Sequence, residues 1–304
     1  MKRSYQLLSL GFTFLIMVLL STGCSKDENI TPQDGQLDGR GFTTIGTGKT
    51  VNFFALSDRN DLLRYKAGPP AQLVSVTPLI GLGPTEHMLA IDFRPANGNL
   101  YGVSDSSRIY IISTDGGQVK PIGKTLEPTI KGSSVGFDFD PYTDQIRLVT
   151  DQGQNLRIDP NFGSVAAVDA DINPPGAAIN AVAYSRTASA GRTFPLYDID
   201  AARGVLLRQD PPNDGLVTMI GSLGLVISGE GGFDIGSANN THIISPNQTA
   251  VGYAVLYGHV LAGGLSGGDN LAADAYRVFE INLTTGKATY KGLLNRNVIG
   301  IAIP

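Results

Sequence analysis

Short apolar runs alternate with turn residues along most of the chain. From about residue 51 onward, runs rich in β-branched and aromatic residues are separated by Gly, Pro, Asp and Asn, which is the pattern of strands joined by turns. No segment after the first fifty residues combines a sustained helical period of apolar positions with capping residues. The pattern predicts an all-β domain over residues 51–304.

One of these runs recurs with the same residue pattern. Its copies are LAIDFRP (89–95), VGFDFDP (135–141) and GGFDI (231–235), with a weaker copy AVAY (181–184). A second run follows each, then a third, which we assign to residues 108–112, 155–159, 196–200 and 278–282, and a fourth run after a turn that usually contains glycine. Four short strands that recur about every 45 to 50 residues are typical of a propeller blade. The sequence predicts a β-propeller of about five four-stranded blades.

The two ends of the domain supply strands to one blade in this prediction. The first unit begins at what corresponds to a second strand, residues 51–56, and the run IGIAIP (299–304) resembles the first strand of the other units. Closure of the ring by both termini would leave no exposed sheet edge there. The unit between Phe233 and Tyr276 carries an insertion, glycine-rich over residues 261–270, where we expect specificity to reside.

The N-terminal segment predicts export and a lipid anchor. Basic residues at positions 2 and 3 precede an apolar run over residues 7–20, which is typical of a signal peptide and shorter than a membrane-spanning helix needs. The run ends at Ser21-Thr22-Gly23-Cys24, which resembles a lipobox, and this resemblance implies diacylglycerol on the Cys24 thiol. We assign residues 1–23 to the signal peptide and 24–50 to a flexible, lipid-anchored linker. An ordinary secreted protein with a stray thiol is the alternative.

Residues 25–28, which follow the cysteine, favour an outer-membrane location. This stretch, SKDE, resembles the export signal that sends Bacteroidetes lipoproteins to the outer leaflet; a solvated start to the linker is the alternative. We therefore predict an outer-membrane lipoprotein, with surface exposure left open. Its predicted partners are the membrane, through the lipid, and a protein or glycan, and the chain itself is expected to be monomeric.

Composition excludes several classes of protein. Cys24 is the only cysteine of the chain, so intramolecular disulfides and four-cysteine zinc sites are excluded. A net charge of −4 without a Lys/Arg cluster leaves no basic surface for nucleic acid. The domain is therefore expected to rest on its hydrophobic core and to bind no nucleic acid.

Three aspartates occupy the same point of the repeated first strand. They are Asp92, Asp138 and Asp234, whereas Ala183 and Ala302 stand at that point in the other units. If the side chains face the central channel, they form an incomplete carboxylate ring that could hold calcium through its oxygen atoms. In the alternative, each carboxylate caps the turn after its own strand through local backbone hydrogen bonds. No other cofactor is predicted.

Other motifs fail in their context, and no catalytic residue is predicted. The stretch GLSGG (264–268) lacks the strand and the helix that flank a nucleophile elbow, and GTGKT (46–50) lacks the spacing of a phosphate-binding loop. His87, His242 and His259 show no metal-ligand spacing.

Two arginines on adjacent predicted strands, Arg147 and Arg157, lie near Asp144, Asp151 and Asp159. They predict either a polar groove for an anionic or hydroxylated ligand, or a set of cross-strand salt bridges on an outer face.

Several of these runs together resemble a known family. The runs GFDF (136–139), DQGQNLR (151–157) and LYDID (196–200), with PPNDG (211–215), are similar to the bacterial secreted domain-of-unknown-function family 4394 across nearly all of residues 51–304. The resemblance implies a propeller-like extracellular domain. The family carries no established activity or catalytic residues to transfer.

Two functional hypotheses of different classes follow. The favoured one is a lipid-anchored extracytoplasmic binding or scaffold module, with a ligand site at one channel mouth built from inter-strand loops. The alternative is a metal-dependent hydrolase or lyase that acts on an extracellular glycan or small molecule, and a purely structural cell-surface protein is a third reading. A histidine that converges with Asp92, Asp138 and Asp234 at metal-ligand distance would favour the enzyme.

Overall fold

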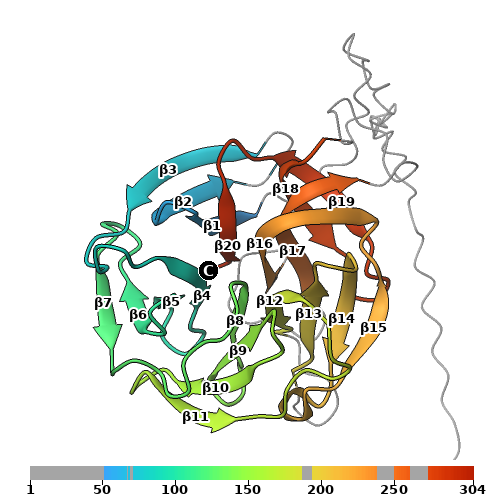
Figure 1. Cartoon of the computed structure of the whole chain (residues 1–304). Coiled ribbons are helices and arrows are strands. Elements are labelled where there is room, and N and C mark those ends of the chain that lie inside the picture. The colour runs from blue at the N-terminus through green and yellow to red at the C-terminus, as the bar shows by residue number, and fades with distance from the viewer. Residues whose placement is uncertain (1–50, 67, 69–70, 187–193, 238–249, 261–272) are drawn as a thin grey trace, which may run out of the picture.

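The chain folds into a ring of β-sheets. The computed structural model describes residues 51–304 except 67, 69–70, 187–193, 238–249 and 261–272. These residues form five four-stranded antiparallel sheets, arranged as blades around a central axis with the C-terminus near the axis (Figure 1). The predicted all-β propeller of about five blades is confirmed.

Each blade is numbered here in chain order, and its strands are given from the innermost outward. Blade 1 holds β20 (Val298–Ala302), β1 (Asn52–Ser57), β2 (Asp61–Lys66) and β3 (Gln72–Pro78). Blade 2 holds β4 (Met88–Phe93), β5 (Leu100–Ser104), β6 (Ile109–Ile112) and β7 (Val119–Ile122). Blade 3 holds β8 (Val135–Phe139), β9 (Ile146–Thr150), β10 (Asn155–Asp159) and β11 (Ser164–Val168). Blade 4 holds β12 (Ile179–Tyr184), β13 (Leu196–Asp200), β14 (Val205–Gln209) and β15 (Val217–Ser222). Blade 5 holds β16 (Leu225–Ser237), β17 (Ala250–Val260), β18 (Ala275–Ile281) and β19 (Ala288–Leu293).

Both ends of the domain meet in blade 1, as predicted. The C-terminal strand β20 pairs antiparallel with β1, with Ile301 opposite Ala55 and Ala302 opposite Phe54. Within the described residues, the one helical element is the three-residue 3-10 turn η1 (Pro212–Asp214), and no helix is long and apolar enough to cross a membrane. The ring therefore closes through backbone hydrogen bonds between strands that stand at opposite ends of the domain sequence.

One strand assignment was wrong. Residues 196–200, assigned to a third strand, form β13, the second strand of blade 4, and the third strand is β14. Second and third strands carry the same apolar alternation, so the sequence pattern alone does not distinguish them.

The long unit predicted to carry an insertion in blade 5 contains the strand β17. Residues 238–249 and 261–272 of that unit lie outside the described residues.

The hydrophobic core is divided among the junctions between consecutive blades. Five buried clusters occur in the described part of the chain, one at each junction. The cluster between blades 5 and 1, for example, includes Phe53, Tyr65, Val255 and Ile301. Because each buried side chain of this size contributes about 1.5 to 3 kcal/mol, every blade depends on both of its neighbours.

Glycines on the innermost strands allow the blades to approach the axis closely. A Cβ atom added at Gly136 would lie 2.8 Å from the backbone nitrogen of Val182, and one at Gly232 would lie 2.4 Å from that of Ile301. Both distances are far below ordinary van der Waals contact. The narrow centre of the ring therefore requires glycine at these two positions.

Candidate functional site

The three aspartates predicted from the repeat converge at the axis. Asp92 on β4, Asp138 on β8 and Asp234 on β16 each place one carboxylate oxygen within 4.8 Å of the others. All three side chains are buried. We call this group the aspartate cluster. Blades 4 and 1 contribute Ala183 and Ala302 at the same level, so the ring of carboxylates is incomplete, as expected from the sequence.

Each carboxylate of the cluster bonds to the next blade around the ring rather than to its own turn. Every one accepts a backbone N–H from the following blade, and the donors are Phe139 to Asp92 (3.0 Å), Tyr184 to Asp138 (3.3 Å) and Ile303 to Asp234 (2.6 Å). In none of these three bonds does the carboxylate cap the turn after its own strand. The aspartates instead connect neighbouring innermost strands.

The alanine positions explain a further contact. Ala183 stands where an aspartate would accept the N–H of Ile235 on the next blade, but it has no carboxylate. Asp234, which precedes Ile235 on β16, accepts that N–H through Oδ1 at 2.6 Å. The same carboxylate accepts the N–H of Ile303 through Oδ2. Asp234 therefore satisfies the backbone on both sides of its junction, including the segment that follows the closing strand.

Burial makes the aspartate cluster difficult to ionise. Desolvation, followed by the charges of neighbouring aspartates, raises the pKa of Asp92 and of Asp138 well above the usual value. Desolvation also raises the pKa of Asp234, against the opposing effects of the Arg186 guanidinium and two backbone N–H groups. Since buried carboxylates avoid uncompensated charge, the cluster favours a bound proton or a cation.

Arg186 is the charged group that sequence reasoning missed. It follows the end of β12 and is 8% exposed. Its Nη2 donates to the carbonyl oxygen of Ile303 at 3.1 Å, and its charge lowers the pKa of each aspartate in the cluster. Only the fold brings this side chain to the axis, because residue 186 belongs to no repeated motif.

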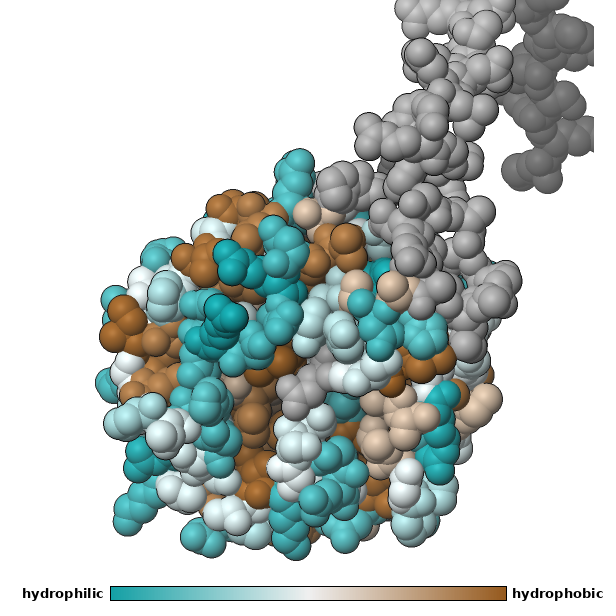
Figure 2. All heavy atoms as spheres, turned by 45° about the horizontal axis from the view of Figure 1, so that its top comes forward, coloured by the Kyte–Doolittle hydropathy of each residue, from teal (hydrophilic) through white to brown (hydrophobic). Residues whose placement is uncertain are grey.

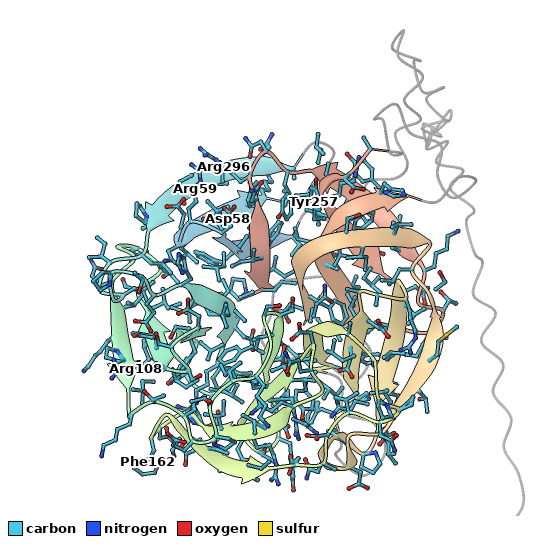
Figure 3. All side chains as sticks on the ribbon, viewed as in Figure 1. Asp58, Arg59, Arg108, Phe162, Tyr257 and Arg296 are labelled. Atoms are coloured by element: carbon cyan, nitrogen blue, oxygen red, sulfur yellow. The ribbon has the colours of Figure 1, made fainter. Side chains whose placement is uncertain are left out.

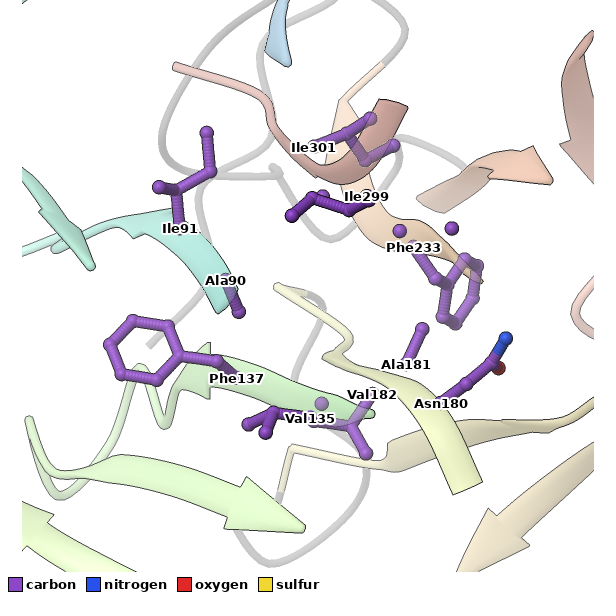
Figure 4. Close-up of a pocket in the computed structure, with 14 residues that line it drawn as sticks. Ala90, Ile91, Val135, Phe137, Asn180, Ala181, Val182, Phe233, Ile299 and Ile301 are labelled. Carbon is purple, nitrogen blue, oxygen red and sulfur yellow. The ribbon is translucent and has the colours of Figure 1, made fainter. Parts of the chain in front are cut away.

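The channel beside the aspartate cluster is narrow. A hollow of about 10 Å³ lies among the innermost strands. Its lining includes residues that directly precede the aspartates, among them Ile91, Phe137 and Phe233 (Figure 4). Asn180, also on this lining, is buried. The hollow offers little room for a substrate.

No histidine joins the cluster in the part of the chain that the structure describes. His87 is paired with Asp105 at 3.2 Å and His259 with Asp274 at 2.6 Å, both away from the axis. The three aspartates therefore converge, but the histidine that would favour a metal-dependent enzyme does not join them among the described residues.

The remaining predicted features lie outside the described residues. They are the signal peptide (1–23), the linker (24–50) with Cys24 and the stretch 46–50, His242, and the stretch 264–268.

The two arginines predicted for a groove or an outer face are placed differently. Arg147 is 2% exposed and lies between blades 3 and 4, where its Nε donates to the Tyr184 hydroxyl. Arg147 and Arg157 both bind Asp169, at 2.6 and 2.8 Å. Their partner is therefore an aspartate of the loop between blades, which sequence proximity did not indicate. Asp144 pairs with Arg94 instead.

A second buried aspartate lies at the same junction. Asp198 on β13 is fully buried, and neither of its carboxylate oxygens has a hydrogen-bond partner among the described residues. Desolvation raises its pKa to about 8, although the nearby charge of Arg147 opposes this shift. Opposite the innermost strand, the corresponding residues of the other blades are apolar or glycine: Ala55, Gly102, Leu148 and Ala254.

A polar groove opens where the ring closes. It encloses about 170 Å³ between the β1–β2 turn and the segment before β20, and its lining residues are Ser57, Asp58, Arg59, Asp61, Asn295, Arg296 and Asn297. We call it the seam groove. Asn297 Nδ2 donates to Asp58 Oδ2 at 2.8 Å across the groove, and Asp58, Arg59 and Arg296 lie close together in Figure 3. The space-filling view of Figure 2 shows hydrophilic and hydrophobic residues interspersed over one face of the ring.

Comparison with solved structures finds distant similarity. The chain is similar to an auxiliary nutrient binding protein from Bacteroides thetaiotaomicron VPI-5482 (12% identity, 56% of this chain and 47% of that one, TM-score 0.37). It is similar to another auxiliary nutrient binding protein from Bacteroides ovatus ATCC 8483 (12%, 56% and 47%, TM-score 0.39). It is also similar to a chain of the Nidogen/Laminin complex (12%, 84% and 98%, TM-score 0.44). The matched region spans about half of each nutrient binding protein.

A search of the curated proteins found no match. A family model matches residues 61–302, from the third strand of blade 1, β2, to the end of the closing strand β20. This match covers most of the chain and nearly all of the propeller. The chain therefore belongs to the family described as domain of unknown function 4394 (DUF4394).

Proposed function

We propose that the protein is an extracytoplasmic binding module at the outer membrane, anchored through lipid on Cys24, and that the seam groove binds its ligand. The anchor rests on the signal peptide and the lipobox-like residues 21–24. The ligand site rests on the groove, which lies between inter-strand loops and is lined by hydrogen-bonding side chains.

The seam groove combines two arginines with two aspartates, and its lining suits a hydroxylated ligand that carries a carboxylate, such as an acidic glycan. Arg59 and Arg296 offer guanidinium donors in a fork geometry that suits carboxylates. Asn295 and Asn297 add amide groups, which can donate to and accept from sugar hydroxyls. This polar lining is the observation that carries the proposal.

The anchor is tested by a Cys24→Ala variant. The wild-type chain should fractionate with membranes and incorporate radiolabelled palmitate, whereas the variant should lose the label and leave the outer-membrane fraction. An unlabelled wild-type chain would contradict lipidation.

The ligand site is tested on an array of acidic and neutral oligosaccharides. The wild-type chain should bind at least one acidic oligosaccharide, and an Arg59→Ala/Arg296→Ala variant should lose that binding by at least tenfold. A matched control, Arg108→Ala/Lys131→Ala, removes the same charge from exposed positions elsewhere on the ring and should bind normally. Equal loss in both variants, or no binding by the wild type, would refute the groove as a glycan site.

A further inference from the structure

We propose that the aspartate cluster holds one divalent cation of the size of calcium. The charges within the cluster point to a dication. Asp92, Asp138 and Asp234 contribute three negative charges when ionised, and Arg186 contributes one positive charge that acts on all three. Three negative charges and one positive charge leave two negative charges, which a single divalent cation neutralises. Isolated charges in a buried, low-dielectric site are costly, so a cation there allows the carboxylates to stay ionised.

The spacing of the oxygens is compatible with a shared calcium ion. Calcium binds oxygen at about 2.3 to 2.6 Å, so two ligands of one ion stand at most about 4.6 to 5.2 Å apart. Magnesium binds at about 2.0 to 2.1 Å, which limits the separation to about 4.2 Å. The three carboxylate oxygens lie within 4.8 Å of one another, which falls within the limit set by calcium.

A buried acceptor at the cluster has no donor. Asp92 is 2% exposed, and its Oδ1 has no hydrogen-bond partner among the described residues, although Oδ2 accepts the N–H of Phe139. The large majority of buried side-chain polar atoms have a partner, and a cation supplies one to a carboxylate oxygen. Asn180, on the lining of the adjacent hollow, also leaves its buried side-chain oxygen without a partner.

The cation would join separate parts of the ring. Its ligands come from blades 2, 3 and 5, and Asp234 also accepts the N–H of Ile303 beside the closing strand. A bound ion would therefore stabilise the closed ring against loss of β20. It binds the native state alone, because the three aspartates are far apart in sequence, and so it should raise the thermal midpoint by mass action.

The test is thermal unfolding of the full chain in detergent, first stripped with a chelator and then given calcium chloride or magnesium chloride. Calcium at about one hundred times its dissociation constant should raise the midpoint by about 5 to 10 °C, and magnesium should raise it less. Asp92→Asn, which keeps an oxygen for the N–H of Phe139, should abolish the shift. Asp198→Asn removes a buried carboxylate outside the cluster and should retain it.

Calorimetric titration of the stripped wild-type chain with calcium keeps the test decisive if the variant fails to fold. One ion bound per chain supports the site. The absence of binding at millimolar calcium overturns the proposal and leaves a cluster neutralised by shared protons. A calcium-induced rise in the midpoint that is as large in Asp92→Asn as in the wild type also overturns it.

Discussion

The buried carboxyl of Asp198 should make the propeller less stable as the pH rises, and Asp198→Asn should remove this dependence. The pKa of Asp198 is about 8 in the folded chain, against 3.8 for an ordinary aspartate. A raised carboxyl pKa means that the folded state holds its proton more tightly than the unfolded state does. The stability is therefore full below pH 4 and is lost as the pH rises towards 8.

The size of the effect follows from the two pKa values. Each pH unit between them costs about 1.4 kcal/mol, so the loss between pH 5 and pH 8 is about 4 kcal/mol, to within a factor of two. For a domain of this size, 1 kcal/mol shifts the midpoint by about 2 to 4 °C. Relative to the wild type, Asp198→Asn should gain about 8 to 16 °C between pH 5 and pH 8.

The assay is calorimetric unfolding of both proteins at pH 5, 6, 7 and 8. The difference between their midpoints isolates Asp198, because the aspartate cluster and all exposed groups are common to both. Asp115→Asn, at an exposed turn position, is the control and should keep a nearly constant difference from the wild type. A constant difference for Asp198→Asn as well would mean that Arg147 or an internal water compensates the charge, and the reasoning would fail.

Three further changes test the ring itself. Deletion of residues 299–304 removes most of β20. It should abolish cooperative unfolding, because blade 1 loses its innermost strand and the hydrophobic cluster between blades 5 and 1 loses Ile301 and Ile303. A native near-ultraviolet circular dichroism spectrum of the deletion variant would contradict this. Gly232→Ala should lower the free energy of unfolding by about 1 to 3 kcal/mol, because the new Cβ atom would lie 2.4 Å from a backbone nitrogen of β20. Its control is Gly300→Ala, whose Cβ atom would lie 3.7 Å from the nearest atom and which should unfold close to the wild-type midpoint. Arg147→Met leaves Asp169 with Arg157 alone and removes the donor to the buried side-chain oxygen of Asn155. It should cost about 1 to 3 kcal/mol, measured by urea unfolding; an unchanged free energy of unfolding would contradict a structural role for this arginine.

The repeat made much of the fold predictable. The alternation within a strand depends on local burial of every second side chain. The four-strand units could therefore be predicted from the sequence, and so could the match between residues 299–304 and residues 90–95. The aspartates at one point of the repeat could be read in the same way, because equivalent positions in a propeller face the same axis. Blade 4 was the exception, since its second and third strands carry the same pattern.

The contacts around the axis could not be read from the sequence. Whether an aspartate bonds its own turn or the next blade depends on the distance between innermost strands, which the glycines at positions 136 and 232 control through packing. Arg186 and Arg147 reach partners in other blades, at sequence separations that no local pattern records. The chain by itself determined its strands, their repeat and their closure, because these follow from local periodicity. The tertiary structure alone decided which charges meet, because buried charges choose partners by distance in space.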